Sequence, residues 1–229
     1  ADLLELAGDL YDRFAEMYPF RLDWPDRRPI AALHPSSSHL GRSKDPNTTN
    51  PRGYLFARKL DVATEQGRRQ FRENALQYAR RSVEVCKGMN AQGVIVWSVE
   101  GQEWPHMISY LGDPRSLPPE MDAVADEFFQ VFTDAGLRVG ICIRPQRAVR
   151  TAYGEKVFQM NFPGRLARKR AMMAKIKHAR ERWGCTLFYL DSNIRWFGDP
   201  VRIPGAAGYS ADMDVQTLAE IMAAFDDVL

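Results

Sequence analysis

The sequence predicts an α/β fold in which parallel strands are joined by helices, and three observations point to it. Apolar runs typical of buried strands alternate with segments whose apolar residues recur at helical spacing, at intervals of roughly 45 to 60 residues. Polar residues follow directly after each apolar run, where α/β barrels and open α/β sheets keep their sites. No GxGxxG or GxxxxGK[ST] motif follows any run, so dinucleotide-binding and P-loop folds are not indicated.

The overall composition is ordinary for a globular domain. The chain has 229 residues, of which 45% are hydrophobic and 26% charged, and this length suits one large domain or two small ones. The net charge of +2 gives no bulk field for nucleic acid or an anionic membrane, and no apolar run approaches a membrane span. Three distant cysteines without a CxxC pair predict neither a disulfide framework nor a structural zinc site.

The first part of the chain predicts a helix, a strand and a long polar loop. Apolar residues at helical spacing from Leu3 to Met17 predict an amphipathic helix. The apolar run 29–33 predicts the first strand, which ends at His34. Residues 35–52 are rich in Ser, Asn and Pro and predict a long loop, which in a compact domain is usually functional or disordered.

The next two units each pair a helix with a strand. Residues 54–57 indicate a short strand or an ordered loop edge, and Thr64 is the expected N-cap of a helix that stops at Gly88. The run 93–99 predicts the second strand. Pro119 fits the first turn of a helix whose Met and Phe residues indicate core packing, and which ends before the third strand at 137–143.

The last units begin with an excursion over 147–162, which predicts a hairpin. A helix from about Pro163 to Trp183 follows, and a fourth strand over 185–191 precedes a final helix near 215–225. The long helix has an expected apolar inner face made by Leu166, Met173, Ile176 and Ala179. Its many cations are assigned to a solvated outer face: Arg165, Arg168, Lys169, Arg170, Lys175, Lys177, Arg180 and Arg182. No aromatic residues are interleaved with them, so nucleic acid is not an expected partner.

Asp191 is the first candidate for chemistry. A buried strand has no structural need for an aspartate at its end, although such a residue can also cap a following turn. The predicted topology brings polar residues of the other strand ends to the same edge: His34, Glu100, Glu103, Arg144, Gln146 and Asn193.

Two stretches resemble a known group of enzymes. Gly112-Asp113-Pro114-Arg115, a helix, and then Ala135-Gly136-Leu137-Arg138-Val139-Gly140-Ile141-Cys142-Ile143-Arg144-Pro145 are similar to the third-strand region of retaining α-glycosidases of the α-galactosidase and α-glucosidase clan. Phe188-Tyr189-Leu190-Asp191-Ser192-Asn193 is similar to that clan's fourth strand, where an Asp near an Asn is the nucleophile. The similarity covers residues 93–193.

The resemblance implies a (β/α) TIM-barrel-like fold and a glycoside hydrolase acting on a carbohydrate. We therefore expect one barrel-like catalytic domain over residues 1–229. Four or five strands are recognised with an N-terminal helix, whereas a barrel needs eight, so the chain would be part of a barrel or a shortened version. Self-association could supply the remaining strands. The clan's Asp-Asp-Gly-Trp-like motif is replaced here by Ser98-Val99-Glu100-Gly101-Gln102-Glu103-Trp104, so its substrate contacts do not transfer.

Such hydrolysis needs two carboxylates across the scissile bond, about 5–5.5 Å apart in retaining enzymes and wider in inverting ones. The resemblance makes Asp191 the nucleophile, which Arg144 would keep ionised unless that arginine only forms a structural ion pair. Glu100 is the expected second catalytic carboxylate, because it lies nearest its strand end and Gly101 gives it room. The expected substrate-binding residues are Glu103, Trp104, Arg144, Gln146, Asn193 and Trp196. Trp97 is expected in the core rather than as a sugar platform.

Two other functions stay open. A non-catalytic carbohydrate-binding or structural α/β module is expected if no paired acid faces Asp191. A metal-dependent hydrolase could use Asp191, Asn193, Asp199 and His106, but their spacing matches no metal motif, so no metal and no cofactor is expected. Polysaccharide hydrolases are often exported, which favours a secreted or periplasmic location.

Overall fold

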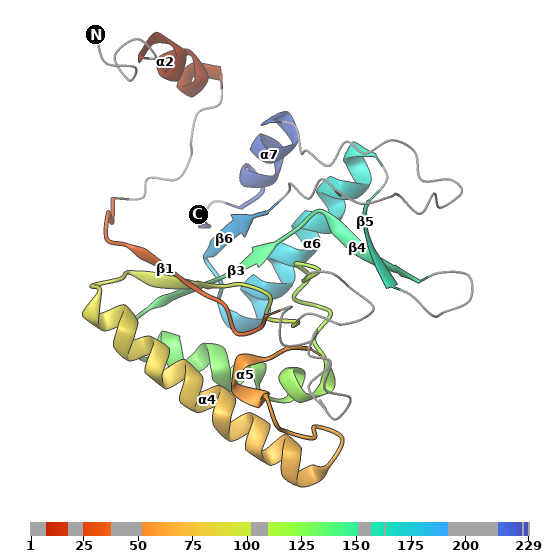
Figure 1. Ribbon diagram of the computed structural model, residues 1–229. Coiled ribbons are helices and arrows are strands. Elements are labelled where there is room, and N and C mark those ends of the chain that lie inside the picture. The colour runs from red at the N-terminus through yellow and green to blue at the C-terminus, as the bar shows by residue number, and fades with distance from the viewer. Residues whose placement is uncertain are drawn as a thin grey trace.

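The structure is a computed structural model that describes residues 8–17, 25–37, 52–101, 110–150, 157–162, 164–191, 215–225 and 227–228. Its centre is a parallel sheet of four strands in the order β1-β2-β3-β6 (Figure 1). The strands are β1 (Ile30–Leu33), β2 (Gly93–Val96), β3 (Arg138–Ile143) and β6 (Leu187–Leu190). Within this sheet, the strands lie side by side in the order in which they occur in the chain, so the predicted parallel α/β arrangement is confirmed.

Helices and one hairpin complete the described structure. The helical elements are α2 (Gly8–Met17), the short 3-10 helix η1 (Leu55–Ala57), α4 (Glu65–Gly88), α5 (Pro119–Asp134), α6 (Arg165–Trp183) and α7 (Val215–Met222). The predicted hairpin is confirmed as β4 (Gln146–Arg150) paired antiparallel with β5 (Val157–Asn161). The helices α4, α5 and α6 lie in the crossovers that connect successive strands of the central sheet.

The ends of the crossover helices are determined by local sequence. The Thr64 side chain accepts a hydrogen bond from the Gly67 amide at 3.0 Å, which caps α4 as predicted. Pro119 occupies the first turn of α5, where its missing N–H costs nothing. Gly184 ends α6 in the left-handed conformation with φ of 68°, which favours glycine.

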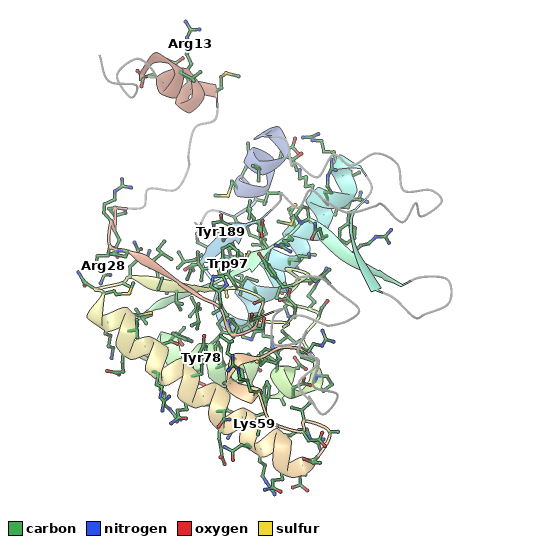
Figure 2. All side chains as sticks on the ribbon, viewed as in Figure 1. Arg13, Arg28, Lys59, Tyr78, Trp97 and Tyr189 are labelled. Carbon is green, nitrogen blue, oxygen red and sulfur yellow. The ribbon has the colours of Figure 1, made fainter. Side chains whose placement is uncertain are left out.

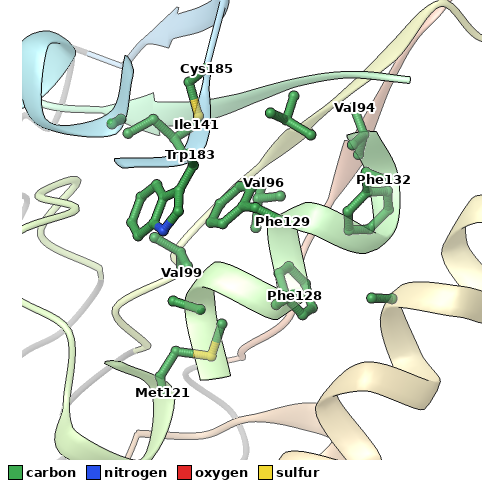
Figure 3. Close-up of a cluster of buried hydrophobic side chains, with 14 of the residues drawn as sticks. Val94, Val96, Val99, Met121, Phe128, Phe129, Phe132, Ile141, Trp183 and Cys185 are labelled. Carbon is green, nitrogen blue, oxygen red and sulfur yellow. The ribbon is translucent and has the colours of Figure 1, made fainter. Parts of the chain in front are cut away.

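One face of the sheet packs against the crossover helices. Alternate strand residues point to this side, and Figure 3 shows Val94, Val96 and Ile141 around aromatic side chains of α5. Phe128, Phe129 and Phe132 are at most 1% exposed, and the Trp183 ring stacks on Phe129 with centroids 4.4 Å apart. Burying four aromatic side chains supplies much of the hydrophobic stabilisation, because each removes about 150–250 Å² from water.

On the opposite face of the sheet, Leu187 of β6 packs closely against the neighbouring strands. A Cβ on Gly140 would come within 2.0 Å of the Leu187 backbone oxygen, and one on Gly93 within 2.8 Å of the Leu187 Cδ1 atom. Leu187 therefore reaches β2, although β3 lies between β6 and β2. The two glycines make room for Leu187 on the side without crossover helices.

The expectations for the second strand and for α6 are wrong in detail. The second strand ends at Val96 rather than Val99, because Ser98 takes a positive φ of 47°. For residues 54–57 a strand and an ordered loop edge were both open, and the structure shows an isolated bridge at Tyr54 followed by the 3-10 helix η1. On α6, Leu166 is 58% exposed, whereas Lys175, assigned to the solvated face, is fully buried.

Most other cations of α6 form ion pairs within the chain. Arg165 and Lys169 contact Glu220, Arg180 contacts Asp227, and Arg182 contacts Asp122 and Asp126. These pairs join α6 to its neighbours. In the part of the chain that the structure describes, no helix combines the length and the apolar character that a membrane crossing requires.

Candidate functional site

A carboxylate, a guanidinium and a phenol meet at the carboxyl edge of the sheet. Both Nε and Nη2 of Arg144 donate to Oδ2 of Asp191, at 3.0 and 2.6 Å, and the Tyr110 hydroxyl donates to the same oxygen. The Arg144 side chain is 6% exposed and that of Asp191 21% exposed. Charge-assisted bonds of this kind are strong, so they fix the orientation of the carboxylate while part of it faces outward.

The backbone brings these groups together. Asp191 follows β6 directly and its amide donates to the Ile143 carbonyl at 3.0 Å, which places it beside Arg144 at the end of β3. The Arg144 guanidinium lies 3.6 Å from the centre of the Tyr110 ring, and its Nη1 donates to the Tyr110 carbonyl at 2.9 Å. Gly112 has φ of 62°, and a Cβ there would lie 2.6 Å from the backbone nitrogen of Arg144. Only glycine fits this approach of the two segments.

An aromatic surface adjoins the carboxylate. The rings of Trp97 and Tyr189 lie 4.6 Å apart, and Trp97 also contacts His34 and Tyr110 at 5.0 and 6.0 Å (Figure 2). Tyr189 is 47% exposed and precedes Asp191 by two residues, so both side chains point to the same side of β6. Trp97 is half-buried and lies just beyond β2, outside the core that packs on the crossover helices.

Glu100 lies close to this edge but is almost completely buried, at 1% exposed. A tight turn places it: the Gly101 amide donates to the Ser98 carbonyl at 2.8 Å, and Gly101 takes a positive φ of 74°. The Glu100 Oε1 atom accepts a hydrogen bond from the Gly112 amide. Burial raises the pKa of Glu100 to about 7, and the backbone hydrogen bonds that favour its charged form only partly oppose this.

A buried lysine lies beneath the site. Lys175 reaches from α6 and donates from Nζ to the main-chain oxygens of Arg144 and Gln146, at 2.6 and 2.9 Å. Its Nζ also lies 3.7 Å from Oδ2 of Asp113. Burial lowers the pKa of Lys175 to about 8, against the attraction of Asp113 and Glu100.

Asp113 is shared between two cations. Burial would raise its pKa, but hydrogen bonds from Arg115 and the nearby Lys175 ammonium outweigh this and lower it. Its carboxylate therefore stays charged and balances Lys175.

Cys142 shows the features of a structural thiol. It is 2% exposed and lies 3.6 Å from the Tyr110 hydroxyl, and burial raises its pKa to about 12. A thiol needs its thiolate form to act as a nucleophile or ligand, so this environment does not favour either role. Within the described residues, no three His, Cys, Asp or Glu side chains come together as metal ligands would.

The structure thus brings together five of the residues predicted at this edge, of which His34 contacts Trp97 in the aromatic surface. Asp191 and Arg144 form the ion pair, Glu100 contacts the segment that supports Arg144, and Gln146 is 5% exposed beside it. The Gln146 Oε1 atom is buried and has no hydrogen-bond partner among the described residues. The predicted substrate-binding residues Glu103, Trp104, Asn193 and Trp196 lie outside the described residues, as do His106 and Asp199.

Two residues of the site were not found from the sequence. Tyr110 lies in a stretch with loop composition and carries no distinguishing pattern. Lys175 does have a signal, because it occupies the same stripe of α6 as Met172, Ile176 and Ala179, which are all buried. A lysine inside an apolar stripe indicates one of two arrangements: its methylene chain covers apolar surface, or its ammonium group is buried with hydrogen-bonding partners.

The chain matches no protein-family model, and no curated protein matches it in sequence.

Proposed function

We propose that the chain is a glycoside hydrolase acting on a carbohydrate, with Asp191 as its nucleophilic carboxylate. The observation that carries the proposal is the oriented Asp191 carboxylate beside the partly exposed rings of Trp97 and Tyr189. Sugars present apolar faces that stack on aromatic rings and hydroxyl groups that bind charged side chains. The Arg144 and Tyr110 donors orient the carboxylate, as a nucleophile directed at an anomeric carbon must be oriented.

The resemblance to the α-galactosidase and α-glucosidase clan and the (β/α) barrel belong to the same proposal. Four parallel strands in chain order and crossover helices on one face are features that a segment of such a barrel would have.

Glu100 is the proposed second carboxyl group. A pKa of about 7 leaves it mostly protonated in mildly acidic solution, as a general acid must be. Gln146 is a proposed contact for a sugar hydroxyl, since its Oε1 atom has no hydrogen-bond partner among the described residues. Because this atom is buried, a sugar reaches it only if its surroundings move.

The burial of Glu100 favours a second candidate function, a carbohydrate-binding module without catalysis. With 1% exposure and Oε1 held by the Gly112 amide, Glu100 meets a sugar only if its surroundings move. The aromatic surface and the Asp191–Arg144 pair would bind sugar equally well in such a module.

The deciding experiment measures sugar release from a panel of α- and β-linked aryl glycosides. The chain is compared with Asp191→Asn, which keeps the shape but removes the charge, and with Asp134→Asn, which changes an exposed aspartate at the end of α5. Release that is lost only in Asp191→Asn supports the glycosidase. Release by all three proteins excludes Asp191 as nucleophile. Sugar binding by calorimetry without any release supports the binding module.

A further inference from the structure

A group of four charged side chains lies beneath the Asp191 site, and of these only Glu100 has a role in the proposed reaction. It consists of Lys175 from α6, Glu100 from the turn after β2, and Asp113 with Arg115 from the loop before α5. With all four ionised, two positive and two negative charges balance. Buried charges are expensive unless each one has partners, so the chain keeps this group at a cost in stability.

Lys175 acts on the main chain. An ammonium has three N–H donors, and three oxygens surround it: the Arg144 and Gln146 carbonyls and the Asp113 carboxylate. The two carbonyls flank Pro145 at the point where the chain leaves β3 for the β4–β5 hairpin. Lys175 therefore holds the backbone from which the Arg144 side chain extends to Asp191.

Glu100 acts on the segment that packs against Arg144. Its Oε1 atom accepts from the Gly112 amide, and the Gly112 carbonyl accepts from the Arg144 amide at 3.1 Å. The same segment carries Tyr110, whose hydroxyl bonds to Asp191 and whose carbonyl binds Arg144 Nη1. Both side chains that donate to Asp191 are thus anchored through this buried group.

We propose that Lys175 is a positioning residue for Asp191, and that with Glu100 and Asp113 it fixes the two segments whose side chains orient the carboxylate. This inference rests on the proposed glycosidase for its kinetic test, and it has a second test that does not need activity. Lys175 does not touch substrate in this proposal; it acts through Arg144.

The kinetic test compares Lys175→Met with Lys169→Met. Methionine fills the volume of the buried side chain without its charge, and Lys169 lies on the same helix but pairs with Glu220 away from the site. We expect kcat to fall about 100-fold in Lys175→Met while KM changes by less than about threefold, because the carboxylate is misplaced while the Trp97 and Tyr189 rings, which would stack on the sugar, stay where they are. Wild-type kcat in a folded Lys175→Met protein would overturn the proposal.

A double variant separates positioning from plain stability. Above pH 7, where Glu100 is ionised, Glu100→Gln/Lys175→Met removes one buried charge of each sign, so we expect it to recover most of the thermal stability lost in Lys175→Met. Because Glu100 is itself a proposed catalytic group, kcat of the double variant is compared with that of Glu100→Gln alone. The double variant lacks the donor to the Arg144 and Gln146 carbonyls, so its kcat should be about 100-fold below that of Glu100→Gln. Equal kcat in these two proteins would mean that Lys175 only balances charge, which overturns the proposal. The double variant also serves if Lys175→Met does not fold.

Carbon-13 NMR of the aspartate side chains tests positioning without a substrate. The Asp191 carboxyl resonance is assigned by its loss in Asp191→Asn, and we expect it to move in Lys175→Met and in the double variant but not in Lys169→Met. An unmoved resonance in all variants would overturn the proposal. If the wild-type chain releases no sugar, the proposed function fails, and this measurement alone decides the role of Lys175.

Discussion

At the residue scale, two carboxyl groups near one sheet edge are held in opposite environments. Asp191 receives three donors on one oxygen and is partly exposed, whereas Glu100 is buried and has a pKa raised to about 7 by that burial. Separate environments of this kind let two chemically similar groups take different protonation states at the same pH. The Asp191 and Glu100 variants test whether these environments make Asp191 a nucleophile and Glu100 a general acid.

Gln146 gives a prediction at the same scale. We expect Gln146→Met to leave the free energy of unfolding unchanged or raise it by up to about 1 kcal/mol, because it removes a buried acceptor without a partner among the described residues. The same change should weaken sugar binding by about five- to tenfold, since a hydroxyl loses its acceptor. Urea unfolding and calorimetric titration with the sugar measure the two effects. Loss of stability with unchanged affinity would show that Gln146 is structural.

At the element scale, the contact of Leu187 with Gly140 determines how β3 and β6 fit together. We predict that Gly140→Ala destabilises the fold by about 3 kcal/mol, because the new methyl group would overlap the Leu187 backbone oxygen at 2.0 Å. Trimming the Leu187 side chain should not rescue it, since the nearest atom belongs to the main chain. Gly88→Ala, at the end of α4 with no atom within 4 Å, is the control and should be neutral or slightly stabilising. Denaturant unfolding followed by circular dichroism compares them; equal midpoints would contradict the prediction.

The elements were predictable because each carries its own local signal. Local signals predicted α4 and α5 close to their observed ends. These signals are the Thr64 cap, Pro119 in the first turn of α5, and the apolar stripe from Met121 to Phe132. The errors arise where tertiary contacts override the local pattern. Leu166 fits a helical stripe but lies in the first turn of α6, where its side chain stays 58% exposed. Lys175 is buried because main-chain carbonyls of another segment accept hydrogen bonds from its ammonium group.

At the scale of the whole molecule, the site follows from topology more than from any motif. Parallel strands in chain order bring Arg144 and Asp191 to one edge, and this was predictable from the alternation of strands and helices. The contribution of Tyr110 was not, because a loop residue reaches the site through the close approach that Gly112 permits. Pairings between distant loops leave no periodic trace in a sequence.

Global stability should also report the buried glutamate through its dependence on pH. Folding raises the pKa of Glu100 from 4.5 to about 7, so the folded chain binds this proton more tightly than the unfolded chain. Its stabilising contribution is complete below pH 4.5 and is lost as the pH rises through 7, up to about 3 kcal/mol. Two groups act in the opposite direction: burial lowers the pKa of His178, which matters near pH 6.5, and that of Lys175, which matters above pH 8.

The comparison of wild type with Glu100→Gln isolates this effect, because His178 and Lys175 are present in both proteins. Glutamine keeps the acceptor for the Gly112 amide but cannot ionise. We expect the wild type to lose unfolding free energy relative to Glu100→Gln between about pH 5 and pH 7.5, measured by urea unfolding at each pH. Glu84→Gln, an exposed change on α4, should run parallel to the wild type. Parallel profiles for all three proteins would mean that Glu100 titrates alike in the folded and unfolded chains. This result would contradict its proposed role as a buried acid.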